Sequence, residues 1–209
     1  MISINNPKHT LYIEVCGGIA SGKTTFAGLM SRVDVTPVFE DFKTNPFWQA
    51  FYSDPVKYAF ETEITFLLQH YHQIKKDQLI TGKSICCDFS FFLDIAYAEI
   101  GLKGSKLKTF ISVYNEIKQD LPPPTLLIYL KCDAKTELER IRNRGRTVED
   151  SITVEFLEAL NSALERQVEK IRGSLPVVVI DSTLKDFAHD ESIKLEVIEP
   201  VSDLIADLS

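Results

Sequence analysis

The chain has 209 residues, of which 44% are hydrophobic and 25% are charged. That composition excludes a disordered protein, and the length suits a single domain over residues 1–209. No apolar run approaches the roughly 20 residues that span a bilayer. A formal net charge of −7 argues against a nucleic-acid-binding protein. Neither a membrane nor a nucleic acid is therefore an expected partner.

Five short apolar runs, rich in Val, Ile, Leu and Tyr, predict β-strands. They are Leu11–Cys16, Val35–Phe39, Ser84–Cys87, Thr125–Leu130 and Pro176–Ile180. Because the runs are continuous rather than alternating, we expect strands that are buried on both faces, as in a parallel sheet.

Helices are predicted between these strands. In chain order they are Lys23–Val33, a long helix from Pro55 (capped by Asp54) that ends by Gly82, Ser90–Ile100, Lys106–Lys118, Lys135–Arg142 and Thr153–Arg172. Residues 185–195 are predicted to be a polar loop, and Val201–Leu208 a terminal helix. Alternating strands and helices require crossover connections. The predicted fold is therefore an α/β three-layer sandwich with a five-stranded parallel sheet flanked by helices.

The four cysteines are Cys16, Cys86, Cys87 and Cys132, and no two of them form a CxxC pair. Because they lie in or beside apolar runs, we expect buried thiols rather than a metal site. The N-terminal residues lack the basic and apolar segments of a secretory signal. Together these features lead us to expect a cytoplasmic protein.

A complete phosphate-binding loop lies between the first predicted strand and the first predicted helix. The loop GGIASGKT matches GxxxxGK(S/T), and its residues are Gly17, Gly18, Ile19, Ala20, Ser21, Gly22, Lys23 and Thr24, followed by Thr25. Backbone N–H groups of such a loop converge on phosphate oxygens at a helix N-terminus. Lys23 would contact the β- and γ-phosphates, and the Thr24 hydroxyl would bind Mg²⁺. The motif predicts a P-loop kinase-like fold that binds ATP or another nucleoside triphosphate, but not the phosphoryl acceptor.

Acidic residues follow the second and third predicted strands. Glu40 and Asp41 come just after the second strand, and Asp88 follows the third. Ligands of open α/β sheets bind beyond the carboxyl ends of the strands. These carboxylates are therefore candidates for a general base and for a Mg²⁺-linked group, the latter being Asp88 beside Thr24. The alternative is that they are ordinary loop acids.

The long helix from Pro55 carries Glu63 and His70, which are seven residues apart and share a face. Both are candidate substrate-binding residues, as are Glu40 and Asp94. Glu63 lies beside the apolar stripe, where a carboxylate needs a partner or a ligand. Alternatively, Glu63 lies at the edge of the stripe and reaches water. Asp94 comes four residues after Ser90 and would face the end of the third strand.

Four arginines lie within seven residues, at Arg140, Arg142, Arg144 and Arg146. Arg140 and Arg144 share a helical face, and Gly145 permits a turn. Arginines bind phosphates through two parallel hydrogen bonds and neutralise charge on a transferring phosphoryl group. We therefore predict a short arginine-rich lid at about residues 139–152. The alternative is a solvated basic helix face.

Taken together, these motifs resemble the deoxynucleoside kinase family. That family has a phosphate loop, a glutamate after a strand, an "NP…FY.D" segment, an "(E/D)RS" motif and an "RxxxRxR..E" lid. In this chain they correspond to Gly17–Thr24, Glu40, Asn45-Pro46 with Phe51–Asp54, Asp88–Ser90 and Arg140–Glu149. The matches occur in order from about residue 11 to residue 160.

The resemblance implies a homodimeric kinase that transfers the γ-phosphate of ATP, with Mg²⁺, to the 5′-hydroxyl of a deoxynucleoside. Glu40 would be the general base, and Lys23 and Arg144 would act with it in catalysis. Tyr52 and Glu149 would hold the sugar, and Asp94 matches the aspartate that contacts the base. Arg140, Arg144 and Arg146 would bind the donor and its phosphates.

Three positions depart from the family pattern, and all lie on the acceptor side. Phe89 replaces the arginine of the (E/D)RS motif, Glu63 replaces a glutamine, and His70 replaces an arginine. An ionised glutamate only accepts hydrogen bonds, whereas a glutamine amide also donates them. Base preference therefore does not carry over. A kinase of nucleoside monophosphates or another small hydroxyl compound, and a nucleotide-binding regulator without catalysis, remain alternatives.

Overall fold

The computed structural model describes residues 10–80 and 82–208 and contains one five-stranded sheet. The strands are β1 Tyr12–Gly17, β2 Thr36–Val38, β3 Ile85–Cys87, β4 Leu126–Lys131 and β5 Val177–Asp181. All are parallel, in the order β2-β3-β1-β4-β5. Every predicted strand is therefore present to within two residues. Residues 1–9, on which the expectation of no secretory signal rests, lie outside the described residues.

Burial differs between the centre and the edges of the sheet. All residues of β1 and β3 are buried, as are the first five of β4. In the edge strands, however, Thr36 of β2 is exposed and Val179 of β5 is 48% exposed. The expectation of two-sided burial was wrong for β2 and β5, because an edge strand has a neighbour on only one side.

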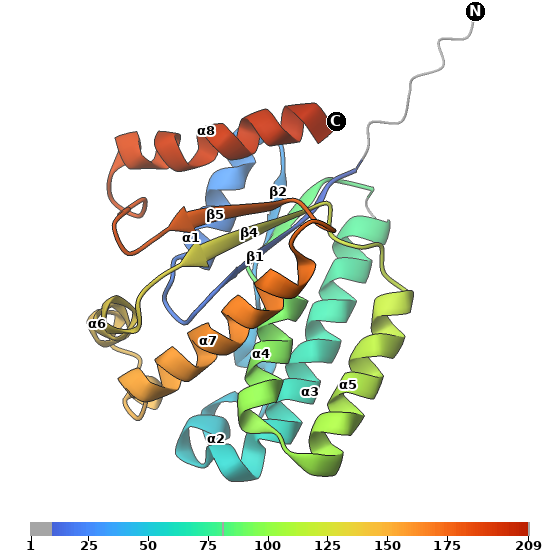
Figure 1. Cartoon of the computed structure of the whole chain (residues 1–209), viewed down its shortest axis with the longest axis vertical. Coiled ribbons are helices and arrows are strands. Elements are labelled where there is room, and N and C mark those ends of the chain that lie inside the picture. The colour runs from blue at the N-terminus through green and yellow to red at the C-terminus, as the bar shows by residue number, and fades with distance from the viewer. Residues whose placement is uncertain (1–9, 81, 209) are drawn as a thin grey trace, which may run out of the picture.

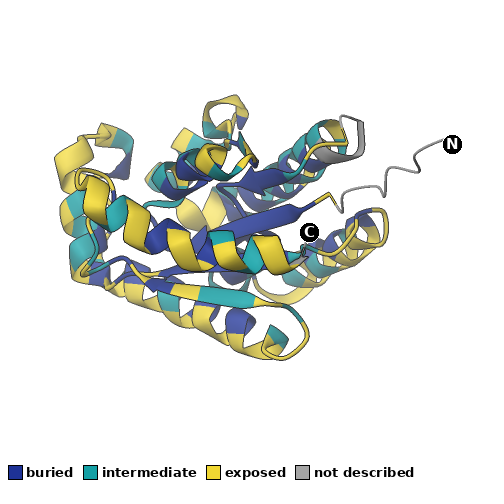
Figure 2. Ribbon diagram, turned by 90° about the horizontal axis from the view of Figure 1, so that it is seen from above, coloured by how far each residue is buried: buried dark blue, intermediate teal, exposed yellow. Residues whose placement is uncertain are grey.

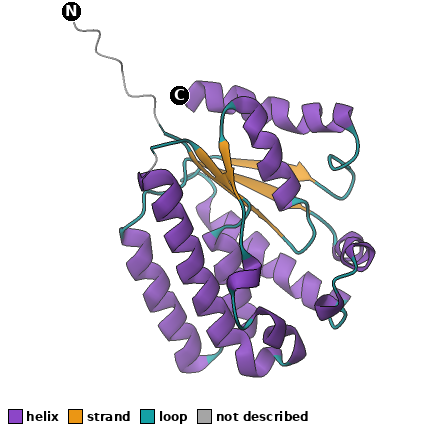
Figure 3. Ribbon diagram, turned by 180° about the vertical axis from the view of Figure 1, so that it is seen from behind, coloured by secondary structure: helices purple, strands orange, loops and turns teal. Residues whose placement is uncertain are grey.

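Helices cover both faces of the sheet and complete a three-layer sandwich (Figures 1 and 3). The helices are α1 Lys23–Leu29, α2 Trp48–Ser53, α3 Pro55–Ile74, α4 Phe91–Gly101, α5 Gly104–Gln119, α6 Ala134–Arg144, α7 Val154–Ile171 and α8 Glu191–Leu208. Short 3₁₀ turns cover Met30–Val33, Phe42–Thr44 and Thr147–Glu149, and a π-helical segment, Lys75–Ile80, continues α3. Within the described ranges, no helix is long and apolar enough to cross a membrane.

Side-chain alternation on β1 sorts the core into two faces. Ile13 and Val15 pack with α1 and α8 on one face of the sheet. Tyr12 and Cys16 point to the other face, which α3, α4, α5 and α7 cover. The strands between these layers are mostly buried, and exposed residues lie on the outer sides of the helices (Figure 2). The described cysteines are all buried free thiols, as expected.

Two helical features differ from the sequence-based expectation. Helix α2 was not predicted, since six residues are too few to show a helical period. Helix α8 begins at Glu191 rather than Val201, so part of the predicted polar loop at 185–195 is helical. The Asp190 side chain accepts the backbone N–H of Ser192 at 2.8 Å, which caps the new start. Helix α8 continues through Pro200, the residue just before the predicted start at Val201.

Candidate active site

The phosphate loop joins β1 to α1 and requires glycine at defined positions. Gly22, at the start of α1, has a φ of 100°, in the left-handed region that side chains disfavour. A Cβ on Gly18 would collide with the carboxylate of Glu137 and the side chain of Asn161. Lys23 folds back along the loop, and its Nζ donates to the carbonyl oxygens of Gly17 (3.0 Å) and Gly18 (2.8 Å).

Lys23 lies among carboxylates. Burial lowers the pKa of its ammonium, and the charges of Glu40, Asp88 and Glu137 oppose that effect. The lysine is therefore a cation held close to the strand-end acids, where it can meet the phosphates of a nucleotide.

Thr24 and Asp88 form a pair beside the loop. The Thr24 hydroxyl lies beside the Asp88 carboxylate. Burial raises the pKa of Asp88, and the nearby hydroxyl limits that rise. Hydroxyl and carboxylate oxygens suit Mg²⁺, which keeps several ligands from water and phosphate. The pair thus fits the metal that the sequence predicts. In the part of the chain that the structure describes, no group of three or more His, Cys, Asp or Glu side chains is arranged to hold a metal ion.

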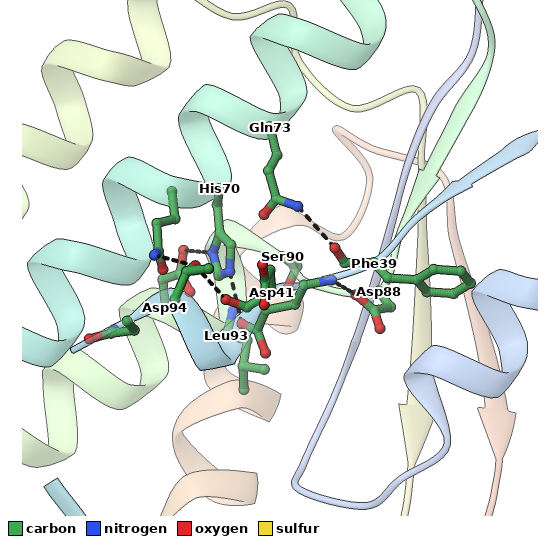
Figure 4. Close-up of polar contacts among 12 residues, drawn as sticks. Phe39, Asp41, His70, Gln73, Asp88, Ser90, Leu93 and Asp94 are labelled. Atoms are coloured by element: carbon green, nitrogen blue, oxygen red, sulfur yellow. Dashed lines mark hydrogen bonds and ion pairs between the residues drawn. The ribbon is translucent and has the colours of Figure 1, made fainter. Parts of the chain in front are cut away.

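Asp88 also reaches the second strand-end carboxylate. Its Oδ1 accepts the backbone N–H of Glu40 at 2.6 Å. On the other side, Gln73 of α3 donates to the carbonyl oxygen of Phe39 at 2.9 Å. These two contacts hold the chain after β2 between β3 and α3; Figure 4 shows Gln73 reaching Phe39. The Glu40 side chain lines the cleft.

The Glu40 side chain is one end of a row of three charged groups. Its Oε1 lies 2.9 Å from Nε2 of His70, and Nδ1 of His70 lies 2.9 Å from Oδ2 of Asp94. Figure 4 shows His70 of α3 facing Asp94 of α4. Burial lowers the pKa of His70, but Asp94 and Glu40 outweigh it and raise the pKa to about 10. His70 is therefore an imidazolium between two carboxylates.

Glu63 is buried, with 4% of its surface exposed. The alternative in which it reaches water is therefore wrong. Burial, followed by the charge of Asp94, raises the pKa of Glu63 well above its usual range. A neutral carboxylic acid both donates and accepts hydrogen bonds. In its protonated form Glu63 offers the same pair of functions as the glutamine that the family resemblance leads us to expect.

Residues of the predicted lid line the cleft. Arg144 contacts Oε2 of Glu149 through Nε at 2.9 Å and Nη2 at 2.7 Å, and Arg146 lies 3.4 Å from Oε1 of Glu149. Arg140 donates to the carbonyl oxygens of Ser182 (2.7 Å) and Ala20 (3.4 Å). Three of the four arginines therefore face the cleft, while Arg142 pairs with Asp150 away from it.

A cavity of about 500 Å³ brings most of the predicted site residues together. The predicted residues that line it are Ile19, Ala20, Gly22, Lys23, Thr24, Thr25, Glu40, Tyr52, Glu63, His70, Asp88, Asp94, Arg140, Arg144, Arg146 and Glu149. Gly17, Gly18 and Ser21 belong to the loop but do not line this cavity. Aromatic residues that the sequence analysis missed also line it, namely Phe42, Trp48, Phe66 and Tyr97. Of these, Phe66 lies on α3 three residues after Glu63, so helical spacing was a signal for it.

The model of one protein family, described as deoxynucleoside kinase, matches residues 13–206. The chain belongs to the deoxynucleoside kinase family. It is therefore a phosphotransferase that acts on an alcohol acceptor, a deoxynucleoside, and uses a nucleotide as phosphate donor.

Two relatives show the range of names within this family. The deoxyguanosine kinase of Bacillus subtilis (strain 168) is 30% identical over 201 residues, covering 93% of this chain and 97% of the relative. The deoxyadenosine kinase of Dictyostelium discoideum is 29% identical over 176 residues, covering 81% and 71%. A structure of deoxyadenosine kinase from M. mycoides with bound dCTP aligns with a TM-score of 0.77 and 24% identity, covering 92% of this chain and 98% of that one. That likeness confirms the predicted fold.

The charge on His70 should make the stability of the protein depend on pH. His70 keeps its proton in the folded state up to about pH 10, whereas an unfolded histidine loses it at about pH 6.5. Its contribution is fully present below pH 6.5 and is lost as the pH rises through 10. Near pH 8, His70→Gln should make the fall in unfolding free energy with pH shallower by roughly 1.4 kcal/mol per pH unit.

Urea denaturation of both proteins at several pH values measures these slopes. His72→Gln, at an exposed position two residues along α3, is the matched control. Equal slopes for the wild-type protein and His70→Gln would contradict a buried imidazolium.

Proposed function

We propose that this chain transfers the γ-phosphate of ATP to the 5′-hydroxyl of a deoxynucleoside, with Glu40 as the general base. One observation carries the proposal: a continuous series of contacts crosses the cleft. Thr24 contacts Asp88, Asp88 holds the backbone of Glu40, and Glu40 pairs with His70 beside Asp94. A carboxylate thus lies between the phosphate loop and the opposite wall, where a hydroxyl must approach a terminal phosphate.

The roles follow from charge and position. Glu40 lies at the cavity with 33% of its side chain exposed, so it can take the proton of an incoming hydroxyl. Lys23 and Arg144, which line the same cavity, supply positive charge to the phosphoryl group in transfer. Thr24 and Asp88 would hold Mg²⁺, which neutralises phosphate charge when it is bound with the nucleotide.

The remaining residues of the cavity suit an acceptor with a sugar and a base. Tyr52 and Glu149 would hold the sugar, and the phenyl and indole rings of the wall give the base apolar surface. Glu63, as a neutral acid, and Asp94 would pair with the base edge. We propose a purine deoxynucleoside as the first acceptor to test, because the relatives at 29 to 30% identity are named deoxyguanosine and deoxyadenosine kinases.

We further propose that residues 1–209 work as one kinase domain, that 139–152 form its lid, and that the enzyme is a homodimer, as the family resemblance implies. A probable thymidylate kinase of Picrophilus torridus is also 27% identical over 198 residues. Deoxynucleoside monophosphates therefore belong in the same acceptor panel.

Glu40→Gln should reduce kcat by roughly 10²- to 10⁴-fold, because a neutral amide cannot take the hydroxyl proton. ATP binding should persist, since Lys23 and the loop are untouched. Coupled ADP release with a purine deoxynucleoside measures turnover, and calorimetric titration measures nucleotide binding. Glu116→Gln, the same change at an exposed position on α5, should leave both unchanged. If Glu40→Gln turned over as fast as the wild-type protein, Glu40 would not be the general base.

Glu63→Gln tests whether Glu63 acts as a neutral acid. A glutamine amide has the same shape and also donates and accepts, so KM for the acceptor should stay within about threefold of the wild-type value. Glu63→Ala loses the contact and should raise KM roughly tenfold. Steady-state kinetics at fixed ATP concentration measure both values. If Glu63→Gln were as impaired as Glu63→Ala, Glu63 would bind the acceptor as a carboxylate instead.

A further inference from the structure

Both nitrogen atoms of the His70 ring are committed to carboxylates. Nε2 pairs with Glu40 and Nδ1 pairs with Asp94, each at 2.9 Å. Only 3% of the His70 side chain is exposed. The ring therefore has no free N–H group to offer an acceptor, which argues against the direct substrate contact expected for His70 from the sequence.

Aromatic packing fixes the plane of the same ring. Phe89 stacks on His70 with a centroid separation of 4.1 Å and an interplanar angle of 9°. Phe66 lies at 5.8 Å and 25°. With Phe89 stacked on the ring and Phe66 nearby, the direction of both N–H bonds is set before any ligand arrives. The face of the Phe89 phenyl ring also attracts a cation, and the His70 imidazolium is that cation.

The charged groups around His70 come from four elements. Asp94 faces it from α4, Glu40 from the segment after β2, Glu14 from β1, and Glu63 from its own helix α3. Burial raises the pKa of Glu14 to about 7 and that of Glu63 well above its usual range. Burial also raises the pKa of Asp94, and His70 opposes that rise. Of these four acids, Asp94 and Glu40 are the two that are hydrogen-bonded to His70.

We propose that His70 is a positioning residue for phosphoryl transfer, and that its ring ties the carboxylate of Glu40 to the acceptor-side carboxylate of Asp94. This inference rests on the proposed role of Glu40 as general base. The contact uses Oε1 of Glu40 and so leaves Oε2 to the incoming hydroxyl.

The arrangement links acceptor binding to the chemical step. The nucleobase of an acceptor would pair with Asp94 on one side of the His70 ring. The hydroxyl of the acceptor would approach Glu40 on the other side. Because a stacked ring cannot tilt freely, it holds the carboxylates of Glu40 and Asp94 in a fixed relation to each other. A cation at the position of Phe89 is not needed for this purpose, since His70 already provides it.

Kinetics of His70→Gln test the positioning role, with His72→Gln as the matched control. The variant should lower kcat on the order of 10- to 100-fold, because the Glu40 carboxylate is no longer held in its orientation. KM for ATP should stay unchanged. A kcat equal to that of the wild-type protein would overturn the proposal.

NMR of ¹⁵N-histidine-labelled full-length protein tests the row of contacts without any turnover and without a variant of His70. The His70 signals should be those of a doubly protonated ring between about pH 6 and 9. In Glu40→Gln, and separately in Asp94→Asn, the ring should lose its proton at lower pH than in the wild-type protein. A neutral His70 ring at neutral pH in the wild-type protein would overturn the proposal.

The kinetic and NMR experiments distinguish a failure of the proposed function from a failure of the inference on His70. If the wild-type protein phosphorylated no deoxynucleoside or monophosphate, the proposed function would fail while the NMR result still decided whether His70 bridges the two carboxylates. If the wild-type protein were active and His70→Gln equally so, the inference on His70 alone would fail.

Discussion

The arrangement of side chains in the cleft depends on the carboxylate of Asp88. It accepts the backbone N–H of Glu40 and lies beside the hydroxyl of Thr24, and so brings the chain after β2 to the phosphate loop after β1. That contact is possible because β1, β2 and β3 are parallel neighbours whose carboxyl ends meet at one edge of the sheet. We propose that the loop and α1 hold the phosphate donor, and that α3 and α4 hold the acceptor.

Charge balance explains how an acidic chain can build a site for a triphosphate. The α3 side of the cleft carries an imidazolium, His70, between two carboxylates, and a third acid, Glu63, whose pKa is raised by burial. The donor side carries Lys23 and arginines of the lid. Glu149 pairs with Arg144 and Arg146 and remains 2% exposed, so the lid charges are partly neutralised within the protein. The net charge of −7 therefore says little about the field inside the cleft.

Much of the fold follows from local signals that the sequence displays directly. Continuous apolar runs located all five strands, and Asp54-Pro55 marked the start of α3, where the Asp54 carboxylate does accept the N–H of Lys57 at 3.1 Å. The phosphate loop followed from one motif because its glycines are required by backbone geometry and close contact. The start of α8 could not be predicted, because Asp190 and the buried side chains of Val197 and Ile198 matter only once the helix packs beside α1.

The acceptor side shows where sequence reasoning stops. The spacing of Glu63 and His70 placed both on one face of α3, and Asp94 was a candidate from its own position. Their protonation states, however, depend on burial and on neighbours that are distant in the chain, such as Glu40 and Phe89. The sequence showed three departures from the family pattern, and the structure shows that two of them, Phe89 and His70, form one stacked pair.

A crystal structure of the protein with a purine deoxynucleoside and a non-hydrolysable ATP analogue tests the central claim most directly. The account predicts the triphosphate on the loop Gly17–Thr24 and the 5′-hydroxyl oxygen within hydrogen-bond distance of a Glu40 carboxylate oxygen. It also predicts that the pairs of His70 with Glu40 and Asp94 are retained. An acceptor whose 5′-hydroxyl points away from Glu40, or a His70 ring that has left both carboxylates, would contradict it.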